Sequence, residues 1–129
     1  MANDASKSTR FDLEERLIDF AVSILTVASS LDQDSIGNHL GRQLIRSGTS
    51  PALNYAEALG AESRKDFVHK MKIVLKELRE TAVCLRLLVR VSRIPTEHSA
   101  EKECKELIAI VYKSIQTATR NMGKISNIQ

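Results

Sequence analysis

A row of seven basic residues along the segment 63–93 has the types and spacing best suited to contact with a ligand. Successive members lie seven, four, three, seven, four and three residues apart. Because an α-helix turns by about 100° per residue, these spacings place all of them in one stripe of a helix. A straight row of cations can follow the phosphates of RNA or DNA. We call these residues the basic row: Lys65, Lys72, Lys76, Arg79, Arg86, Arg90 and Arg93.

The alternative interpretation of the basic row is a solvated helix face balanced by acidic neighbours. Glu80 is four residues from Lys76, and the first predicted helix carries Glu14, Glu15 and Asp19. Aromatic residues, on which the bases of single strands stack, do not interleave with the row. The net charge of +3 is too small to imply nucleic acid by itself. The basic excess is local, however, because residues 61–95 carry 9 Lys and Arg against 4 Asp and Glu.

The same segment carries apolar residues that lie off its predicted core face. They are Ile73, Val83, Leu87 and Val91. A helix that is apolar nearly all round is usually buried on more than one side. We therefore expect a homo-oligomer in which these four residues contribute to the subunit interface.

Polar residues occupy a helix that should pack centrally, and they predict a structural polar network. Buried polar and charged groups must find partners, because an unpaired one is costly. Arg46 or Asn54 is expected to reach Glu77 or Glu80 on the following helix. The predicted network consists of Gln43, Arg46, Ser50, Asn54, Glu57, Glu77 and Glu80. A ligand pocket at these residues is the alternative interpretation.

Residues that could support catalysis or hold a metal do not form a recognisable pattern. His39, His69 and His98 lie on three different elements, and there is no HExxH, GxSxG, P-loop or GxGxxG motif. Cys84 and Cys104 form no CxxC pair and fit small, buried, apolar positions. We expect no enzyme activity, no catalytic residue, no metal, no cofactor and no small-molecule substrate.

Four amphipathic helices must position these residues. Apolar residues recur at spacings of three and four, and Asp12, Ser35 and Ser63 are suitable N-caps. Pro95 and Gly123 mark the ends of the last two helices. The pattern predicts an all-α, antiparallel up-down-up-down four-helix bundle. The predicted helices span residues 12–31, 35–59, 63–92 and 96–122.

The length of 129 residues predicts one domain, with a four-helix bundle at 11–123. Residues 1–10 are small and polar and predict a disordered leader, and 124–129 predict a frayed tail. No signal peptide or membrane-spanning segment is visible, so we expect a cytoplasmic protein without a membrane partner.

The second predicted helix is rich in small residues and contains a proline. Gly41, Ser47, Gly48 and Ala52 would let a neighbouring helix approach closely. Pro51 removes one backbone hydrogen bond and predicts a kink. The alternative is a pair of short helices broken at residues 48–51, because GTSP also resembles a loop.

The middle of the chain resembles the bacterial 23S rRNA intervening-sequence proteins, the S23 ribosomal protein family. The resemblance covers residues 11–119 and is most specific in QLIRSGTSPALNYAEA and in the helix that follows. The sequence departs from the family pattern at Tyr55, where isoleucine is usual, and at Ala58, where many members have glycine. The matching residues are Gln43, Arg46, Ser47, Gly48, Ser50, Asn54, Glu57, Asp66, Phe67, Glu77 and Glu80.

The resemblance implies a helical bundle that assembles into a ring-like homo-oligomer, a pentamer, with no known enzymatic activity. A related family of bundles assists reverse transcriptases through a basic surface that meets nucleic acid, although fold alone does not carry function. Two functions follow as hypotheses. The first is a non-enzymatic oligomer that binds RNA or DNA through the basic row. The alternative is an assembly or adaptor protein that binds another protein and has no role with nucleic acid.

Overall fold

The chain forms four long helices in a computed structural model that describes residues 9–128, with side chains for 13–123. Residues 1–8 of the predicted leader lie outside the described part, whereas Thr9 and Arg10 belong to the first helix. The predicted all-α fold is confirmed for this part of the chain. The helices are α1 (Thr9–Ser29), α2 (Ser35–Leu59), α3 (Arg64–Arg90) and α4 (Ser99–Ile128).

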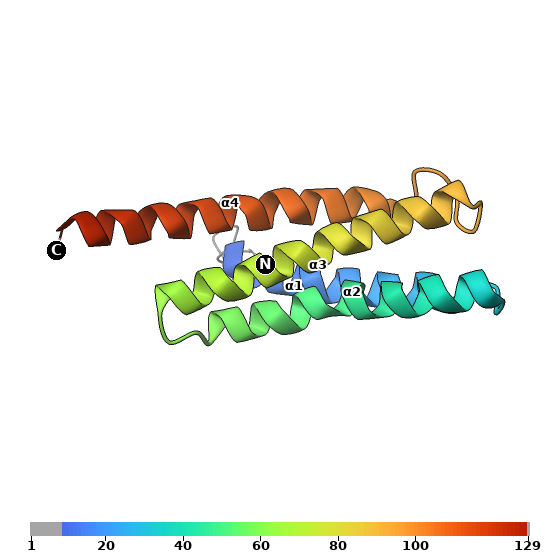
Figure 1. Cartoon of the computed structure of the whole chain (residues 1–129), viewed down its shortest axis with the longest axis horizontal. Helices are drawn as coiled ribbons and strands as arrows, with labels where there is room; N and C mark the ends of the chain where they lie inside the picture. The colour runs from blue at the N-terminus through green and yellow to red at the C-terminus, as the bar shows by residue number, and fades with distance from the viewer. Residues whose placement is uncertain (1–8, 129) are drawn as a thin grey trace, which may run out of the picture.

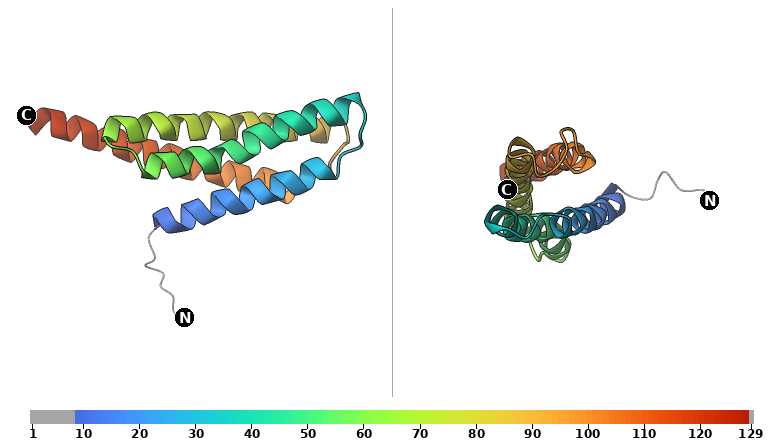
Figure 2. Two further views of the ribbon diagram at one scale, coloured as in Figure 1. Left: turned by 90° about the horizontal axis from the view of Figure 1, so that it is seen from below. Right: turned by 90° about the vertical axis from the view of Figure 1, so that its right-hand side faces the viewer.

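The helices run up, down, up and down, and each packs against the next along the chain (Figure 1). α1 also contacts α4, which closes the four-helix arrangement. α1 and α3 lie on a diagonal, and their backbones make no close contact in the described range (Figure 2). The C-terminal part of α4 extends past the α2–α3 turn in both figures. No helix in the described range is both long enough and apolar enough to cross a membrane.

The N-terminal ends of α2 and α3 are each capped by a side chain. The carboxylate of Asp34 accepts a hydrogen bond of 2.8 Å from the backbone N–H of Gly37. The predicted cap, Ser35, is therefore wrong by one residue. Ser63 caps α3 as predicted, because its hydroxyl accepts a hydrogen bond of 3.0 Å from the N–H of Asp66. Asp12 lies inside α1, which begins at Thr9, so its predicted capping role is also wrong.

The connection between α3 and α4 is longer than predicted. α3 ends at Arg90 and α4 begins at Ser99, whereas the sequence predicted Ser92 and Thr96. Glu97 has a backbone φ of 59°, the left-handed conformation that stops a helix from starting there. His98 takes the capping role instead, because its Nδ1 accepts a hydrogen bond of 3.0 Å from the N–H of Ala100.

The end of α4 also differs from the prediction. Its backbone continues past Gly123 to Ile128, whereas the sequence predicted a stop near Met122. A C-terminal glycine ends a helix best when it adopts positive φ. No described glycine has positive φ, Gly123 included, so this glycine does not act as a stop.

A continuous apolar core runs along the bundle axis. Every helix contributes fully buried side chains at the predicted three-and-four spacing. The largest of these residues are Phe20, Leu17, Ile24, Leu44, Met71, Leu78, Leu85, Leu88 and Leu107. The core thus positions the outer face of α3, which carries the basic row.

Close approach of α1 and α2 depends on Gly48. A Cβ atom at this position would lie 2.5 Å from Cγ2 of Ile24, well inside contact distance. α2 is one unbroken helix through Pro51, so the prediction of a single helix is confirmed and the broken alternative is wrong. The small residues of α2 therefore serve helix packing, as their pattern predicted.

Candidate nucleic-acid interface

Six members of the basic row lie on α3 and have exposed side chains. The buried residues of α3, such as Met71, Leu78 and Leu85, occupy the opposite face. The sequence therefore identified correctly which face of this helix points to solvent. The exposed members are Lys65, Lys72, Lys76, Arg79, Arg86 and Arg90.

None of these six cations forms an ion pair within the part of the chain whose side chains are described. Glu80, which lies four residues from Lys76 on the same helix and could have neutralised it, is bound to Arg46 instead. The described acidic residues of α1 form no ion pair with the row either, and no close backbone contact joins α1 to α3. The positive charge of the row is therefore available to an external anion.

Arg93 differs from the other members of the basic row. It follows the end of α3, its side chain is 21% exposed, and its Nη1 lies 2.8 Å from Oδ1 of Asp34. This hydrogen bond is the main reason why the pKa of Arg93 is raised and that of Asp34 is lowered. Arg93 therefore links the α3–α4 connection to the start of α2, and it is the member least able to bind a phosphate.

The apolar residues predicted to form a subunit interface lie on the exposed half of α3. Val83 is 53% exposed, Leu87 46% and Val91 43%, whereas Ile73 is half-buried. Val83 and Leu87 lie among Arg79, Arg86 and Arg90 on the same stretch. We call Val83, Leu87 and Val91 the apolar row of α3. The basic row is thus free of large exposed apolar neighbours only in its first part, from Lys65 to Lys76, because Val83 lies one helical turn from Arg79.

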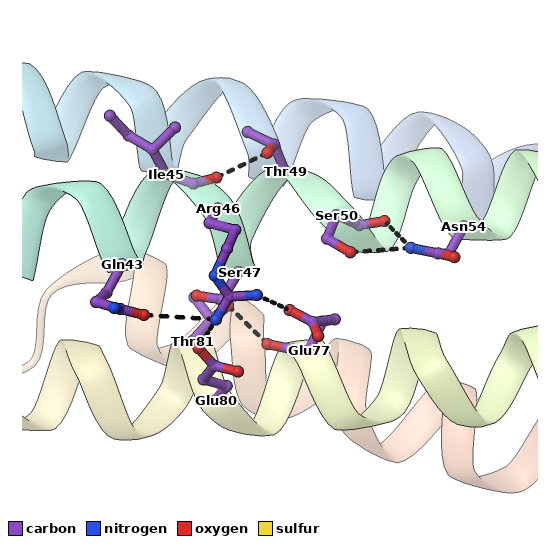
Figure 3. A network of polar contacts seen from close by, with 10 residues as sticks. All are labelled: Gln43, Ile45, Arg46, Ser47, Thr49, Ser50, Asn54, Glu77, Glu80 and Thr81. Atoms are coloured by element: carbon purple, nitrogen blue, oxygen red, sulfur yellow. Dashed lines mark hydrogen bonds and ion pairs between the residues drawn. The ribbon is translucent and has the colours of Figure 1, made fainter.

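The predicted polar network exists around Arg46, where it ties α2 to α3 (Figure 3). Nη1 of Arg46 donates a hydrogen bond of 3.1 Å to Glu77, whose side chain is only 9% exposed. Nη2 is bound to the carboxylate of Glu80 and lies 3.4 Å from Oε1 of Gln43. A buried carboxylate requires a cation and hydrogen-bond donors, and Arg46 supplies both.

A pair of buried hydroxyls adjoins this cluster and was not predicted as part of it. The oxygens of Ser47 and Thr81 lie 2.9 Å apart, and the Thr81 oxygen is 2.8 Å from the carbonyl oxygen of Glu77 (Figure 3). Thr81 has a single hydroxyl proton, so when it donates to that carbonyl, Ser47 donates to Thr81. Pairing of this kind satisfies both groups, and no described buried side-chain nitrogen or oxygen lacks a partner.

The remaining predicted members of the network do not join Arg46. Nδ2 of Asn54 donates to the backbone carbonyl and the hydroxyl of Ser50, one turn earlier in α2. Glu57 forms an ion pair of 2.7 Å with Lys70 on α3. The predicted single network is therefore wrong, because these side chains satisfy one another locally. Lys70 and the pair Ser47–Thr81 could have been found only from the register of α2 against α3.

A second ion-pair cluster joins α1 to α4, and it was not predicted from the sequence. Nη2 of Arg16 lies 2.7 Å from Glu103 and 3.1 Å from Glu106. The hydrogen bond to Glu103 is the main reason why the pKa of Arg16 is raised. Arg16 is thereby held against α4, so the described outer surface of α1 is left with acidic charges.

The two cysteines are free and buried, as their sequence positions predicted. The Sγ of Cys104 lies 3.2 Å from the carbonyl oxygen of Leu78. Burial raises the pKa of the Cys84 thiol to about 11 and that of Cys104 to about 12.

No group of three or more His, Cys, Asp or Glu suited to a metal occurs among the described residues.

An open groove of about 670 Å³ lies near the α2–α3 turn. Its lining is mainly apolar and includes Leu13, Tyr55, Phe67 and Ile110, with Arg64 and Lys113 as its charged residues. It lies apart from the Arg46 cluster, none of whose residues lines it. We therefore interpret the Arg46 cluster as a structural link between α2 and α3.

Comparisons with known proteins agree with the helical architecture. The profile of the 23S rRNA-intervening sequence protein family matches residues 10–113. A similar solved structure is the crystal structure of a protein of unknown function from the S23 ribosomal protein family, from Bacteroides thetaiotaomicron VPI-5482. It is 32% identical to this chain with a TM-score of 0.78, and the match covers 83% of this chain and 97% of that one. No curated protein matches the sequence.

Proposed function

Since the chain belongs to the 23S rRNA-intervening sequence protein family, we propose that it is a non-enzymatic homo-oligomer that binds RNA or DNA through α3. The observation that carries this proposal is that six cations in one row of α3 are exposed and have no ion-pair partner among the described side chains. The family itself does not decide between nucleic acid and another partner, whereas the exposed cations of α3 favour nucleic acid.

The first half of the basic row is the part suited to nucleic acid. Lys65, Lys72, Lys76 and Arg79 project from a rigid helix whose opposite face is locked into the core. Seven residues of helix span about 10 Å, so Lys65, Lys72 and Arg79 distribute three charges along the helix, where each can meet a phosphate of the same backbone. Contacts of this kind are insensitive to base sequence and release counterions, which makes binding strongly dependent on salt.

Oligomerisation is the second component of the proposal. The apolar row of α3 exposes about half of each of three large side chains, next to arginines that suit the rim of an interface. A subunit of 14.4 kDa with one short cationic row makes few phosphate contacts. Several copies in a ring-like assembly, such as a pentamer, would multiply these contacts on one nucleic acid and raise its affinity through avidity.

Charge reversal tests the nucleic-acid component. We expect the triple variant Lys72→Glu, Lys76→Glu, Arg79→Glu to lose binding to a single-stranded or duplex RNA probe, measured by fluorescence anisotropy. The matched control carries Arg42→Glu, Lys102→Glu and Lys113→Glu, three exposed positions on α2 and α4 with the same total change of charge.

The control variant distinguishes the row from net charge. Equal loss of affinity in both triple variants would show that binding depends on overall charge only, and would contradict a role for the row. If both variants instead retain a protein partner at high salt, the adaptor function is favoured, because salt does not screen apolar contacts.

A further inference from the structure

The outer face of α1 carries a second row of exposed apolar residues. Ile18, Val22 and Leu25 recur at spacings of four and three, on the side away from the buried Leu17 and Ile24. Ile18 is 43% exposed, Val22 56% and Leu25 44%. We call these three residues the apolar row of α1. Single exposed apolar residues are ordinary, but a contiguous row on one helix face marks a surface that binds a partner.

The charges beside this row are acidic. Glu14, Glu15 and Asp19 lie on the same stretch of α1, and none of them forms an ion pair with a described side chain. The cation of this stretch, Arg16, is held by two carboxylates of α4. The apolar row of α1 is therefore bordered by uncompensated negative charge.

The apolar row of α3 is bordered by charges of the opposite sign. Val83, Leu87 and Val91 recur at spacings of four and lie among Arg79, Arg86 and Arg90. These three arginines are exposed and form no ion pair with a described side chain. Each row therefore consists of three aliphatic residues over about two helical turns, and their flanking charges are of opposite sign. Such a pair of faces combines apolar contact with electrostatic complementarity.

The two rows cannot meet within one subunit. α1 and α3 stand on a diagonal of the bundle and make no close backbone contact in the described range (Figure 2). The rows are formed by exposed side chains of these helices, away from their buried residues. The complement of each row must therefore come from another molecule. A second copy of this chain supplies the matching shape, polarity and charge for both.

We propose that the acidic apolar face of α1 in one copy docks onto the basic apolar face of α3 in the next copy. This inference rests on the proposed assembly and specifies its contact. Because the two faces differ, the contact is heterologous, and each subunit keeps one free face after docking. Repeated contacts of this kind close into a ring when the rotation between neighbouring copies divides a full turn, whereas the self-complementary contact of a two-fold dimer stops at two copies.

In this docking arrangement, the two ends of the basic row have different roles. Arg86 and Arg90 contact the carboxylates of the neighbouring α1, whereas Lys65, Lys72 and Lys76 remain exposed for phosphates. The charge-reversal triple at Lys72, Lys76 and Arg79 therefore affects the interface only at Arg79.

Mixing two single variants tests the heterologous contact. Val22→Glu removes the α1 face and leaves the α3 face intact, whereas Leu87→Glu does the reverse. Each variant alone is expected to be a monomer by light scattering at micromolar concentration. An equimolar mixture is expected to form a dimer and nothing larger, because only one intact pair of faces is available. Leu53→Glu, at an exposed position on α2, is the matched control and should keep the wild-type mass.

The outcomes separate this inference from the proposed assembly. A monomeric wild type would overturn the assembly itself. An oligomeric wild type that loses mass with Leu87→Glu but not with Val22→Glu would overturn the α1 face and leave the assembly standing. A mixture that stays monomeric would overturn the pairing of the two faces, provided that circular dichroism shows each variant folded.

A charge swap provides a second test of the same contact. Glu15→Arg with Asp19→Arg should weaken assembly, and so should Arg86→Glu with Arg90→Glu. Combining all four substitutions in one chain should restore the wild-type mass, because the charges again oppose each other across the contact. Failure of the combined variant to recover would contradict the proposed pairing.

Discussion

The hydroxyl oxygens of Ser47 and Thr81 lie 2.9 Å apart in the α2–α3 interface, and both side chains are completely buried. The contact joins residues 34 positions apart in sequence and lies beside the ion pair of Arg46 with Glu77. Two polar groups in a dry interface stabilise the bundle only as a pair, since each satisfies the other. The register between α2 and α3 is therefore fixed by a polar contact as well as by the apolar core.

Removing one of these hydroxyls should cost more than removing both. We expect Thr81→Val to lower the free energy of unfolding by about 1–2 kcal/mol, because it leaves the Ser47 hydroxyl buried without this partner. The double variant Ser47→Ala, Thr81→Val should be more stable than the sum of the single effects predicts. Urea denaturation of the four proteins in a double-mutant cycle measures the coupling, and strictly additive effects would contradict it.

The two glycines of α2 near α1 should respond differently to alanine. Gly48→Ala places a methyl group against the branched part of Ile24 and should cost about 1–3 kcal/mol through overpacking. A Cβ atom at Gly41 would lie 3.7 Å from Cδ1 of Leu31, which is an ordinary contact distance. Gly41→Ala should therefore be neutral or stabilise the helix by up to about 1 kcal/mol. Thermal melts of the two variants make the comparison, and equal effects would show that α1 can retreat from α2.

Arg46 and Glu57 should differ in their importance for stability. Arg46→Ala leaves the buried Glu77 carboxylate without its cation and should cost about 1.5 kcal/mol or more. Glu57→Ala breaks an ion pair with Lys70 at the surface and should cost less than about 1 kcal/mol. Chemical denaturation checks both values. A larger loss of unfolding free energy for Glu57→Ala would mean that Glu57 makes a stabilising interaction other than its ion pair with Lys70.

Both thiols should be unreactive in the folded protein near neutral pH. Their pKa values of about 11 and about 12 lie above the ordinary value of 9.0, so the folded chain holds the thiol protons more tightly than the unfolded chain. Their contribution to stability is therefore complete below pH 9 and falls as the pH rises toward 11 and 12. Titration with a disulfide reagent at pH 8 should modify both thiols only in denaturant. Rapid modification of the native protein would contradict their burial.

The sequence predicted the helices and the solvent-facing side of α3 because both follow from apolar periodicity. It predicted that Arg46 or Asn54 would reach Glu77 or Glu80, because polar groups on a central helix have few possible partners, and the structure shows that Arg46 contacts both carboxylates. It failed where the partner depends on register, as for Lys70 with Glu57 and Arg16 with Glu103. It also failed at His98, whose capping role depends on the backbone conformation of the preceding Glu97.

The apolar row of α1 was missed for a different reason. The core stripe of that helix gives the stronger signal, and the opposite row at residues 18, 22 and 25 has the same spacing. Only the observed exposure of these side chains shows that α1 has two apolar faces. The relation between this row and α3 is invisible in the sequence, because it requires the diagonal placement of the two helices.

The most direct test of the proposed function is the mass of the wild-type protein in solution, measured by light scattering with and without a mixed RNA pool. The account predicts a homo-oligomer whose mass is a multiple of 14.4 kDa, increases when RNA is added, and returns to its original value at high salt. A mass that does not change with RNA at low salt would contradict the assignment of the basic row to nucleic acid.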